Sequence, residues 1–158
     1  MNVWSWMLWG FVATAVLTVA LVAMQELRLT RINIPYLLGS IFTPERSRAK
    51  ALGTVLHLLN GWAFSLLYVA AFQSWGKAGV ARGMLVGLVH AAFVLVVGFT
   101  VLPGVHPRMA HDAWGPTARR QLEPPGSLGL HYGALTPLTV LGAHLLFGAI
   151  LGAFYRVR

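Results

Sequence analysis

Three histidines of this chain, His57, His90 and His144, lie in long apolar stretches. An ionisable side chain is costly in such a stretch and usually has a partner or a task. Neutral imidazole can ligate a metal, donate and accept hydrogen bonds, or carry a proton. The sequence therefore places its most reactive side chains where an apolar environment would surround them.

Three interpretations of these histidines stay open. Each ring could donate a hydrogen bond to a backbone carbonyl or to a helix hydroxyl, such as that of Thr14, Thr18 or Tyr68, and so tie helices together. Alternatively, His57 and His144, with His90 nearby, could be axial ligands of haem b or of a chlorin held between helices. In the third interpretation, the three histidines and Asn60 form a polar track for a proton or a small solute.

Two of the histidines open a repeated pattern. Residues 57–61 read HLLNG and precede Tyr68, while residues 144–148 read HLLFG and precede Tyr155. In each copy the histidine, glycine and tyrosine stand at positions 0, +4 and +11, which is about 0°, 40° and 20° around a helix. They share one stripe, and the pattern predicts a duplicated pair of helices.

Small residues extend this stripe and predict close helix packing. Gly61 with Ser65, Gly83 with Gly87, and Gly148 with Gly152 are all small residues four positions apart, a spacing that lets membrane helices approach closely. The predicted packing seam comprises Gly61, Ser65, Tyr68, Gly83, Gly87, Gly148, Gly152 and Tyr155. Because a short loop joins the second and third predicted helices, we expect these two to be close antiparallel neighbours.

The composition is that of an integral membrane protein. The chain has 158 residues, of which 57% are hydrophobic and 10% are charged, whereas about a quarter of a soluble domain is charged. Four charge-free windows separate the charged residues, and each is long enough to cross about 30 Å of hydrocarbon. We expect an all-α bundle of four transmembrane helices at roughly 4–25, 50–74, 82–102 and 137–156.

The connections are unequal. The segment 32–42 is too short to span and is predicted to be interfacial or re-entrant, broken by Pro35 and Gly39. Thr43 and Pro44 have the chemistry of a helix start. A long loop, rich in proline and glycine, occupies about 103–136. We thus expect a single transmembrane domain, 1–158, made of two tandem helical hairpins at about 1–75 and 80–158.

The basic residues predict the orientation. Of the 12 lysines and arginines, eight fall in the connections after the first and third helices, and four fall on the opposite side. The positive-inside rule then places both termini on the non-cytoplasmic side. The net charge of +8 is thus assigned to membrane flanks rather than to nucleic acid. Arg46, Arg48 and Lys50 are the predicted contacts with lipid headgroups.

Other polar residues carry weaker signals. Glu26, beside Gln25, is expected to pair with Arg28 or with the basic start of the second helix. The long loop holds side chains of metal-ligand type, but Pro107 prevents a regular helix through them, so hydrogen bonds within the loop are expected and no metal site is predicted. These side chains are His106, His111, Asp112 and His131, and Arg108 lies in the same stretch.

The segments 31–39 and 42–44, taken with the two histidine motifs, resemble small bacterial integral membrane proteins of unknown function. The resemblance covers most of the chain and implies about four helices in a bacterial inner membrane. It implies no activity.

The expected function is that of a non-catalytic membrane subunit or accessory protein. The chain lacks cysteine, paired membrane carboxylates, a Ser-His-Asp order and a nucleotide-binding loop, so an enzyme is not expected. Its partners would be membrane lipids and other membrane subunits, for example of a respiratory or photosynthetic complex, or further copies of itself. A histidine-ligated haem or chlorin protein and a small-solute or proton transporter are the alternatives.

Overall fold

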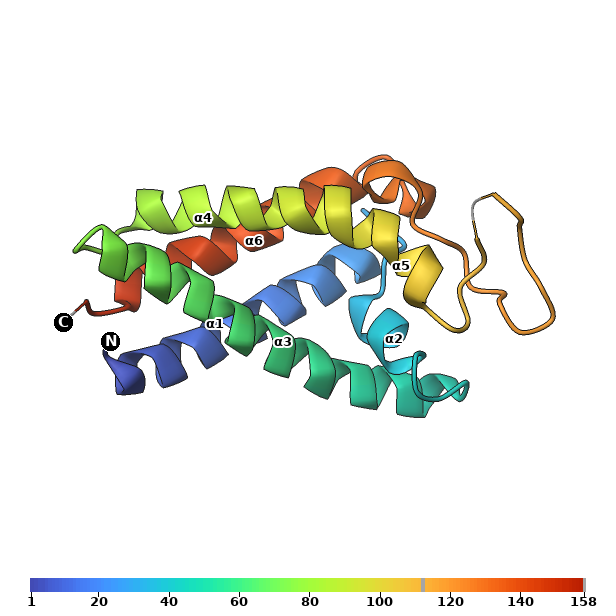
Figure 1. Cartoon of the computed structure of the whole chain (residues 1–158), viewed down its shortest axis with the longest axis horizontal. Helices are drawn as coiled ribbons and strands as arrows, with labels where there is room; N and C mark the ends of the chain where they lie inside the picture. Colours follow the sequence, from blue (N-terminus) through green and yellow to red (C-terminus); the bar gives the residue numbers. More distant parts are fainter. Residues whose placement is uncertain (112, 158) are drawn as a thin grey trace.

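The computed structural model describes residues 1–111 and 113–157 and is helical in its regular parts (Figure 1). The elements are α1 (Val3–Glu26), α2 (Ile34–Gly39), α3 (Arg46–Ser74), α4 (Val80–Ala92), the π-helical segment η1 (Phe93–Gly98), α5 (Phe99–Val105), the short 3₁₀ segment η2 (Ser127–Tyr132) and α6 (Thr136–Phe154). Since α4, η1 and α5 run on without a break, they form one long helix.

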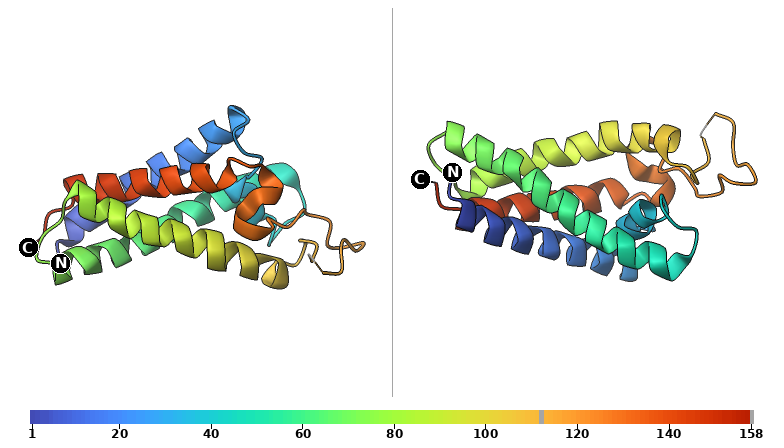
Figure 2. Two further views of the ribbon diagram at one scale, coloured as in Figure 1. Left: turned by 90° about the horizontal axis from the view of Figure 1, so that it is seen from above. Right: turned by 60° about the horizontal axis from the view of Figure 1, so that its bottom comes forward.

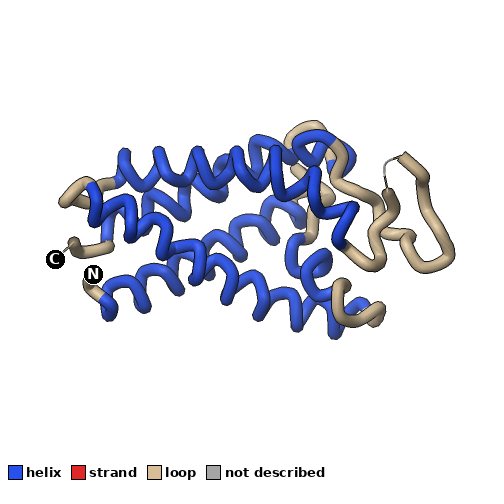
Figure 3. Tube along the Cα trace, in the orientation of Figure 1, coloured by secondary structure: helices blue, strands red, loops and turns tan. Residues whose placement is uncertain are grey.

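Four of these helical stretches are long and apolar enough to cross a membrane: Val3–Glu26, Arg46–Ser74, Val80–Val105 and Thr136–Phe154. The predicted all-α, four-span fold is confirmed at this level. Both termini and the α3–α4 turn lie at one end, while α2 and the long loop lie at the other (Figures 1 and 3).

Helix starts differ from the prediction at two places. Glu45, not Thr43, caps α3, because its carboxylate accepts hydrogen bonds from the backbone N–H groups of Ser47 and Arg48. Hydrogen bonding from the Ser47 hydroxyl and these N–H groups lowers the pKa of Glu45. Pro35 does not break the 32–42 segment either. It lies in the first turn of α2, where its missing N–H costs nothing, after the Asn33 cap.

The spans contact one another in the order α3, α1, α6, α4. Helix α4 packs most extensively against α6, and α1 packs against both α3 and α6. The shared core consists of Ala13, Leu17 and Leu21 of α1, Tyr68 and Phe72 of α3, and Phe147 and Leu151 of α6. The α1–α6 contact therefore joins the two halves of the chain.

The predicted close contact between α3 and α4 is wrong. The two helices meet near their short turn and diverge toward the other end, as the views in Figures 1 and 2 show, and few of their residues approach each other. The physical reason is that their small residues face elsewhere: Gly61 faces α1 and Gly83 faces α6. An open side is left between α3 and α4.

The long loop is held at its base and extends away from the bundle at its tip (Figure 1). Met109 is fully buried and pairs with Leu122 in a single bridge. In contrast, Trp114 at the tip is 80% exposed and stacks on His111. Met109 therefore anchors the base of the loop, whereas Trp114 stays largely open to the surroundings.

Candidate ligand cavity with three histidines

All three histidines and Asn60 line one cavity of about 210 Å³ between the spans. Every span contributes to its wall, and α2 adds Ile34, Leu37 and Leu38. The rest of the lining is apolar and includes Leu17, Leu21, Phe64, Val94, Phe99, Leu102 and Val140. The polar residues that the repeat and the span positions singled out are thus gathered in one place.

The ring of His57 is oriented by α1. Its Nδ1 lies 2.9 Å from the hydroxyl of Thr18, and that hydroxyl donates its own hydrogen to the carbonyl of Thr14, 2.8 Å away. The Thr18 oxygen is therefore the acceptor and His57 Nδ1 carries the hydrogen. In the neutral ring, Nε2 then has a free lone pair, and it has no hydrogen-bond partner among the described residues.

The ring of His144 is oriented by its own helix. Its Nδ1 lies 2.8 Å from the carbonyl oxygen of Val140, which can only accept, so Nδ1 again carries the hydrogen. Nε2 of the neutral ring is an acceptor. The side chain is 6% exposed and borders the cavity, and its ring meets that of His90 edge to face at 4.6 Å between centroids.

The ring of His90 has the opposite polarity. Its Nδ1 lies 3.1 Å from the phenol oxygen of Tyr68, a buried hydroxyl with no other partner in the described structure. A phenol in this setting donates, so Nε2 of His90 carries the hydrogen. Phe64 stacks on the ring at 4.8 Å. The cavity wall thus offers two imidazole acceptors and one imidazole donor.

A second cavity of about 290 Å³ adjoins the first at Phe64 and His90. Its remaining lining is mostly apolar and comes from α3, α4 and the first residue of η1: Leu67, Tyr68, Val86, Val89 and Phe93. At its rim, Leu67 is 60% and Val89 64% exposed. This cavity occupies the open side between α3 and α4 and leads outward from the histidines.

A π-helical stretch forms part of the wall. The segment η1 begins at Phe93, three residues after His90, and its residues Val94 and Gly98 line the cavity. Such stretches are rare and are frequent at functional sites. The hydropathy of the span Val80–Val105 does not indicate the π-helical stretch, because a π-helical turn needs no particular residue type.

The predicted packing seam lies at two separate interfaces. A side chain at Gly83 or Gly148 would overlap the backbone carbonyl of the other glycine, and Gly152 approaches the carbonyl of Gly79 in the same way. At the α1–α3 interface the contacts are with side chains: a Cβ at Gly61 would overlap the Thr14 side chain, and one at Gly10 would lie 2.5 Å from the Ser65 hydroxyl oxygen.

The two seam tyrosines have different partners. The Tyr68 hydroxyl bonds to Nδ1 of His90. Tyr155 instead accepts hydrogen bonds from the backbone of Asn2 and the side chain of Gln73. Tyr155 is only 4% exposed, and Trp6 stacks on Trp62 inside the bundle. Trp4 and Trp75, in contrast, are exposed.

The loop histidines are engaged in hydrogen bonds. His106 is fully buried, its Nε2 3.0 Å from the carbonyl of Leu37 and 3.2 Å from the Ser40 hydroxyl. Arg108 donates to the carbonyls of Ser40 and Ile41 and so fixes the loop base to the turn that follows α2. His131 contacts the carbonyl of Pro124. Asp112 lies outside the described residues.

The predicted ion pair of Glu26 and the predicted lipid contacts of α3 are found only in part. Glu26 forms no ion pair within the described part of the chain, whereas its neighbour Gln25 accepts a hydrogen bond from the side chain of Asn33. Arg48 pairs with Glu45, whereas Arg46 and Lys50 line a separate polar cleft.

Sequence reasoning missed two components of the histidine cavity: the wall formed by α2 and the stacking of Phe64 on His90. The spacing of Phe64, four residues after Asn60 and seven after His57, could have indicated a shared helix face. Across residues 1–111 and 113–157, no group of three or more metal-ligating side chains lies close enough to hold a metal ion. No family model, no curated protein and no solved structure matches the chain.

Proposed function

We propose that the protein is a non-catalytic membrane protein that binds a small membrane-soluble ligand in the histidine cavity. The observation that carries the proposal is the convergence of His57, His90 and His144 on one apolar cavity with their Nε2 atoms unpartnered. These three Nε2 atoms border the cavity, and a ligand that hydrogen-bonds to them would satisfy polar atoms that otherwise face apolar walls.

The chemistry of the lining indicates the ligand class. A planar group with one acceptor and one or two donors would match the donor at His90 and the acceptors at His57 and His144. The cavity volume of about 210 Å³ is about that of seven water molecules in the liquid, which leaves room for a single substituted ring. The adjoining apolar cavity would take a hydrocarbon tail. A quinol with an apolar chain has this combination of groups, because each of its hydroxyls can donate and accept a hydrogen bond.

The other side chains that line the histidine cavity favour binding over catalysis. Among the described residues that line the cavity there is no carboxylate, serine, threonine or lysine, and the chain has no cysteine. Nucleophilic catalysis by a side chain of this kind would need such a group within reach of the ligand. The imidazoles are instead arranged to hold and orient.

The experiment is ligand identification after mild extraction. The full chain is purified from native membranes in a mild detergent, extracted with organic solvent, and the extract is examined by ultraviolet spectroscopy and mass spectrometry. We expect one compound in near-stoichiometric amount, lost in His57→Leu and His144→Leu but kept in His131→Ala, whose ring lies outside the cavity. Wild-type protein that is free of any such compound, and that takes up no added quinol, would contradict the proposal.

A haem or chlorin held by His57 and His144 is the second candidate. Both rings donate from Nδ1 to an oxygen, which is the usual arrangement behind a ligating Nε2. However, the cavity is smaller than the roughly 300–1,000 Å³ of sites for drug-sized ligands, so a macrocycle would need α3 to move outward. Absorption in the Soret or chlorin region that disappears in His144→Ala would favour it.

We further propose that the chain is a tandem repeat of two hairpins, α1–α3 and α4–α6. The support is that residues pair across both interfaces in the same antiparallel pattern. Within each interface, moving four residues forward along one helix moves the contact four residues back along the other. The pairs are Gly10–Ser65, Thr14–Gly61 and Thr18–His57 in one hairpin, and Gly79–Gly152, Gly83–Gly148 and Gly87–His144 in the other.

An accessory role in a larger assembly is compatible with ligand binding. The open α3–α4 side and the exposed loop tip at Trp114 are apolar surfaces that a partner subunit or another copy would cover. The small-residue seams no longer support this role, since they pack within the chain. Native electrophoresis after mild extraction tests the role, because a lone monomer would count against it.

We place the protein in a bacterial inner membrane with both termini on the non-cytoplasmic side. The support is the excess of lysine and arginine in the connections at the α2 end. Reporter fusions at the C-terminus and within the long loop test this orientation. A reporter that is active on the cytoplasmic side at the C-terminus would reverse it.

A further inference from the structure

At the end of the bundle opposite the termini, a polar cleft of about 210 Å³ lies between α2, the start of α3 and the end of the long loop. Three cations line it, Arg31, Arg46 and Lys50, together with one carboxylate, Glu123. Tyr36, Tyr132, Gln25 and Asn33 add hydrogen-bonding groups. The cleft is distinct from the histidine cavity, although Leu37 of α2 lines both.

The two cations of α3 face the cleft because they are one helical turn apart. Arg46 and Lys50 stand at i and i+4, which places them on the same side of the helix. The guanidinium of Arg46 lies over the ring of Tyr36, 5.9 Å from its centroid. Arg48, two residues along, does not line the cleft, and it pairs with Glu45 at 3.5 Å.

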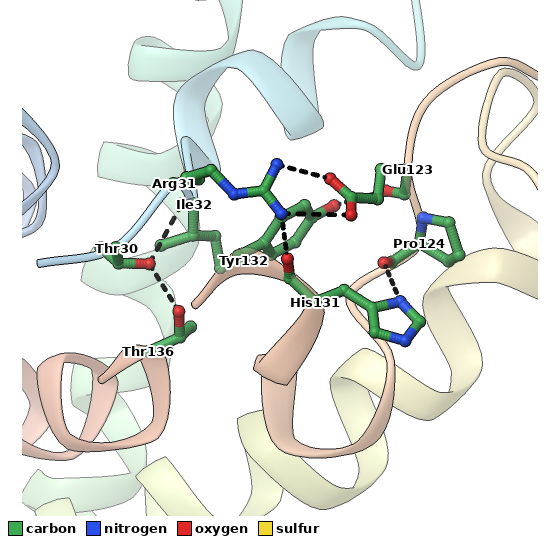
Figure 4. A network of polar contacts seen from close by, with 8 residues as sticks. All are labelled: Thr30, Arg31, Ile32, Glu123, Pro124, His131, Tyr132 and Thr136. Carbon is green, nitrogen blue, oxygen red and sulfur yellow. Dashed lines mark hydrogen bonds and ion pairs between the residues drawn. The ribbon is translucent and has the colours of Figure 1, made fainter. Parts of the chain in front are cut away.

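The third cation is neutralised within the chain. Arg31 forms two hydrogen bonds with the carboxylate of Glu123, at 3.0 and 3.2 Å, and also donates to the carbonyl of His131 (Figure 4). The Tyr132 hydroxyl donates to the backbone carbonyl of Glu123. In the described structure neither Arg46 nor Lys50 has an acidic partner, so the cleft keeps a net positive charge.

We propose that this cleft binds the phosphate of an anionic membrane lipid. The shared chemistry is a phosphate monoanion between Arg46 and Lys50, with Tyr36 and Asn33 within the same cleft. A lipid is the source rather than free phosphate because the cleft lies at the ends of the apolar spans α1 and α3 and has apolar walls at Leu37 and Leu122 for the start of an acyl chain. The site does not depend on the ligand of the histidine cavity.

The test measures lipid binding to the purified full chain in a neutral detergent by native mass spectrometry. Phosphatidylglycerol, phosphatidylcholine and inorganic phosphate are the three probes. We expect phosphatidylglycerol to bind at least about tenfold more tightly than phosphatidylcholine. Each of Arg46→Gln and Lys50→Gln should weaken it about fivefold, the effect of one basic residue at a charged lipid surface. Arg48→Gln, the matched control, should change it by less than about twofold.

Three results would overturn the proposal: equal binding of both lipids, equal weakening by Arg48→Gln and Arg46→Gln, or displacement of phosphatidylglycerol by an equal concentration of inorganic phosphate. The first two would indicate a diffuse charge effect and the third a site for free phosphate. Arg46 and Lys50 are exposed, so their variants should fold. Lys50→Arg, which keeps the charge, should retain binding, and its loss would also contradict the proposal.

Discussion

The α1–α3 and α4–α6 interfaces have the same register but different chemistry. At α4–α6, glycine backbones meet directly, and the carbonyls of Gly83 and Gly148 occupy the space that side chains would need. At α1–α3, threonine and serine side chains fill the same positions, and one of them, Thr18, binds the ring of His57. The first interface is therefore a backbone contact with little room to adjust, and the second is a side-chain contact that also orients a cavity residue.

The largest expected effect is at the glycine interface. Gly83→Ala would place a methyl group against the carbonyl of Gly148, and neither backbone can yield without separating the helices. We expect a loss of about 1–3 kcal/mol or more in the free energy of unfolding, measured by denaturant titration in detergent. Gly142→Ala on α6 is the control, because nothing lies within 4 Å of its new Cβ. A Gly83→Ala variant as stable as this control would break the distinction between the interfaces.

A smaller effect is expected at the side-chain interface. Gly61→Ala would meet the side chain of Thr14, which can be shortened by mutation. We expect a loss of about 1–2 kcal/mol in unfolding free energy. The double variant Gly61→Ala/Thr14→Ala should recover most of it. If the second substitution gave no recovery, the α1–α3 contact would be a backbone contact like its counterpart.

The sequence predicts the positions of the helices better than it predicts which helices are neighbours. Charge-free windows located all four helices to within a few residues, because burial in lipid requires about 20 apolar residues whatever the neighbours are. The helix neighbours were predicted less well. Loop length suggested a close α3–α4 pair, yet the facing of Gly61 and Gly83 decides the packing, and the sequence alone does not determine which helix a glycine faces.

The candidate site was predictable in its residues but not in its geometry. The repeat and the apolar setting identified His57, His90, His144 and Asn60, which all line one cavity. Which nitrogen of each ring is protonated depends on contacts between distant helices, such as Thr18 with His57. The predicted lipid contacts Arg46, Arg48 and Lys50 divide in a similar way. The i,i+3 pair of Arg48 with Glu45 could be read from the spacing, but the cleft that Arg46 and Lys50 line depends on α2 and the loop.

Removing the hydroxyl that orients His57 should have a modest effect on stability and a larger one on ligand retention. Thr18→Val leaves the Nδ1–H of His57 without its acceptor. We expect a loss of about 0.5–1.5 kcal/mol in unfolding free energy, with reduced retention of the cavity ligand. In the control, Thr54→Val, the lost hydroxyl bonds only to the carbonyl of Lys50 on its own helix. Equal retention in both variants would show that the α1–α3 interface does not position the ring.

The smallest expected effect lies outside both interfaces, at the base of the long loop. Burial lowers the pKa of His106, the nearby charges of Arg108 and Arg120 lower it further, and a hydrogen bond with Leu37 opposes them. The unfolded chain therefore binds a proton more readily than the folded one. Stability is full above the usual histidine pKa of about 6.5 and falls as the pH decreases below it. Thermal melting from pH 7.5 to 5 should show this loss, and His106→Asn should reduce it.

The most direct test of the histidine cavity is the protonation of its ring nitrogens, measured by nitrogen-15 NMR on the wild-type chain in lipid bilayers. For neutral rings, we expect a bare Nε2 in His57 and His144 and a protonated Nε2 in His90. On addition of the cavity ligand, these Nε2 signals should shift while the Nδ1 signals stay. Protonated Nε2 atoms in His57 and His144, or ligand-induced shifts confined to histidines of the loop, would contradict it.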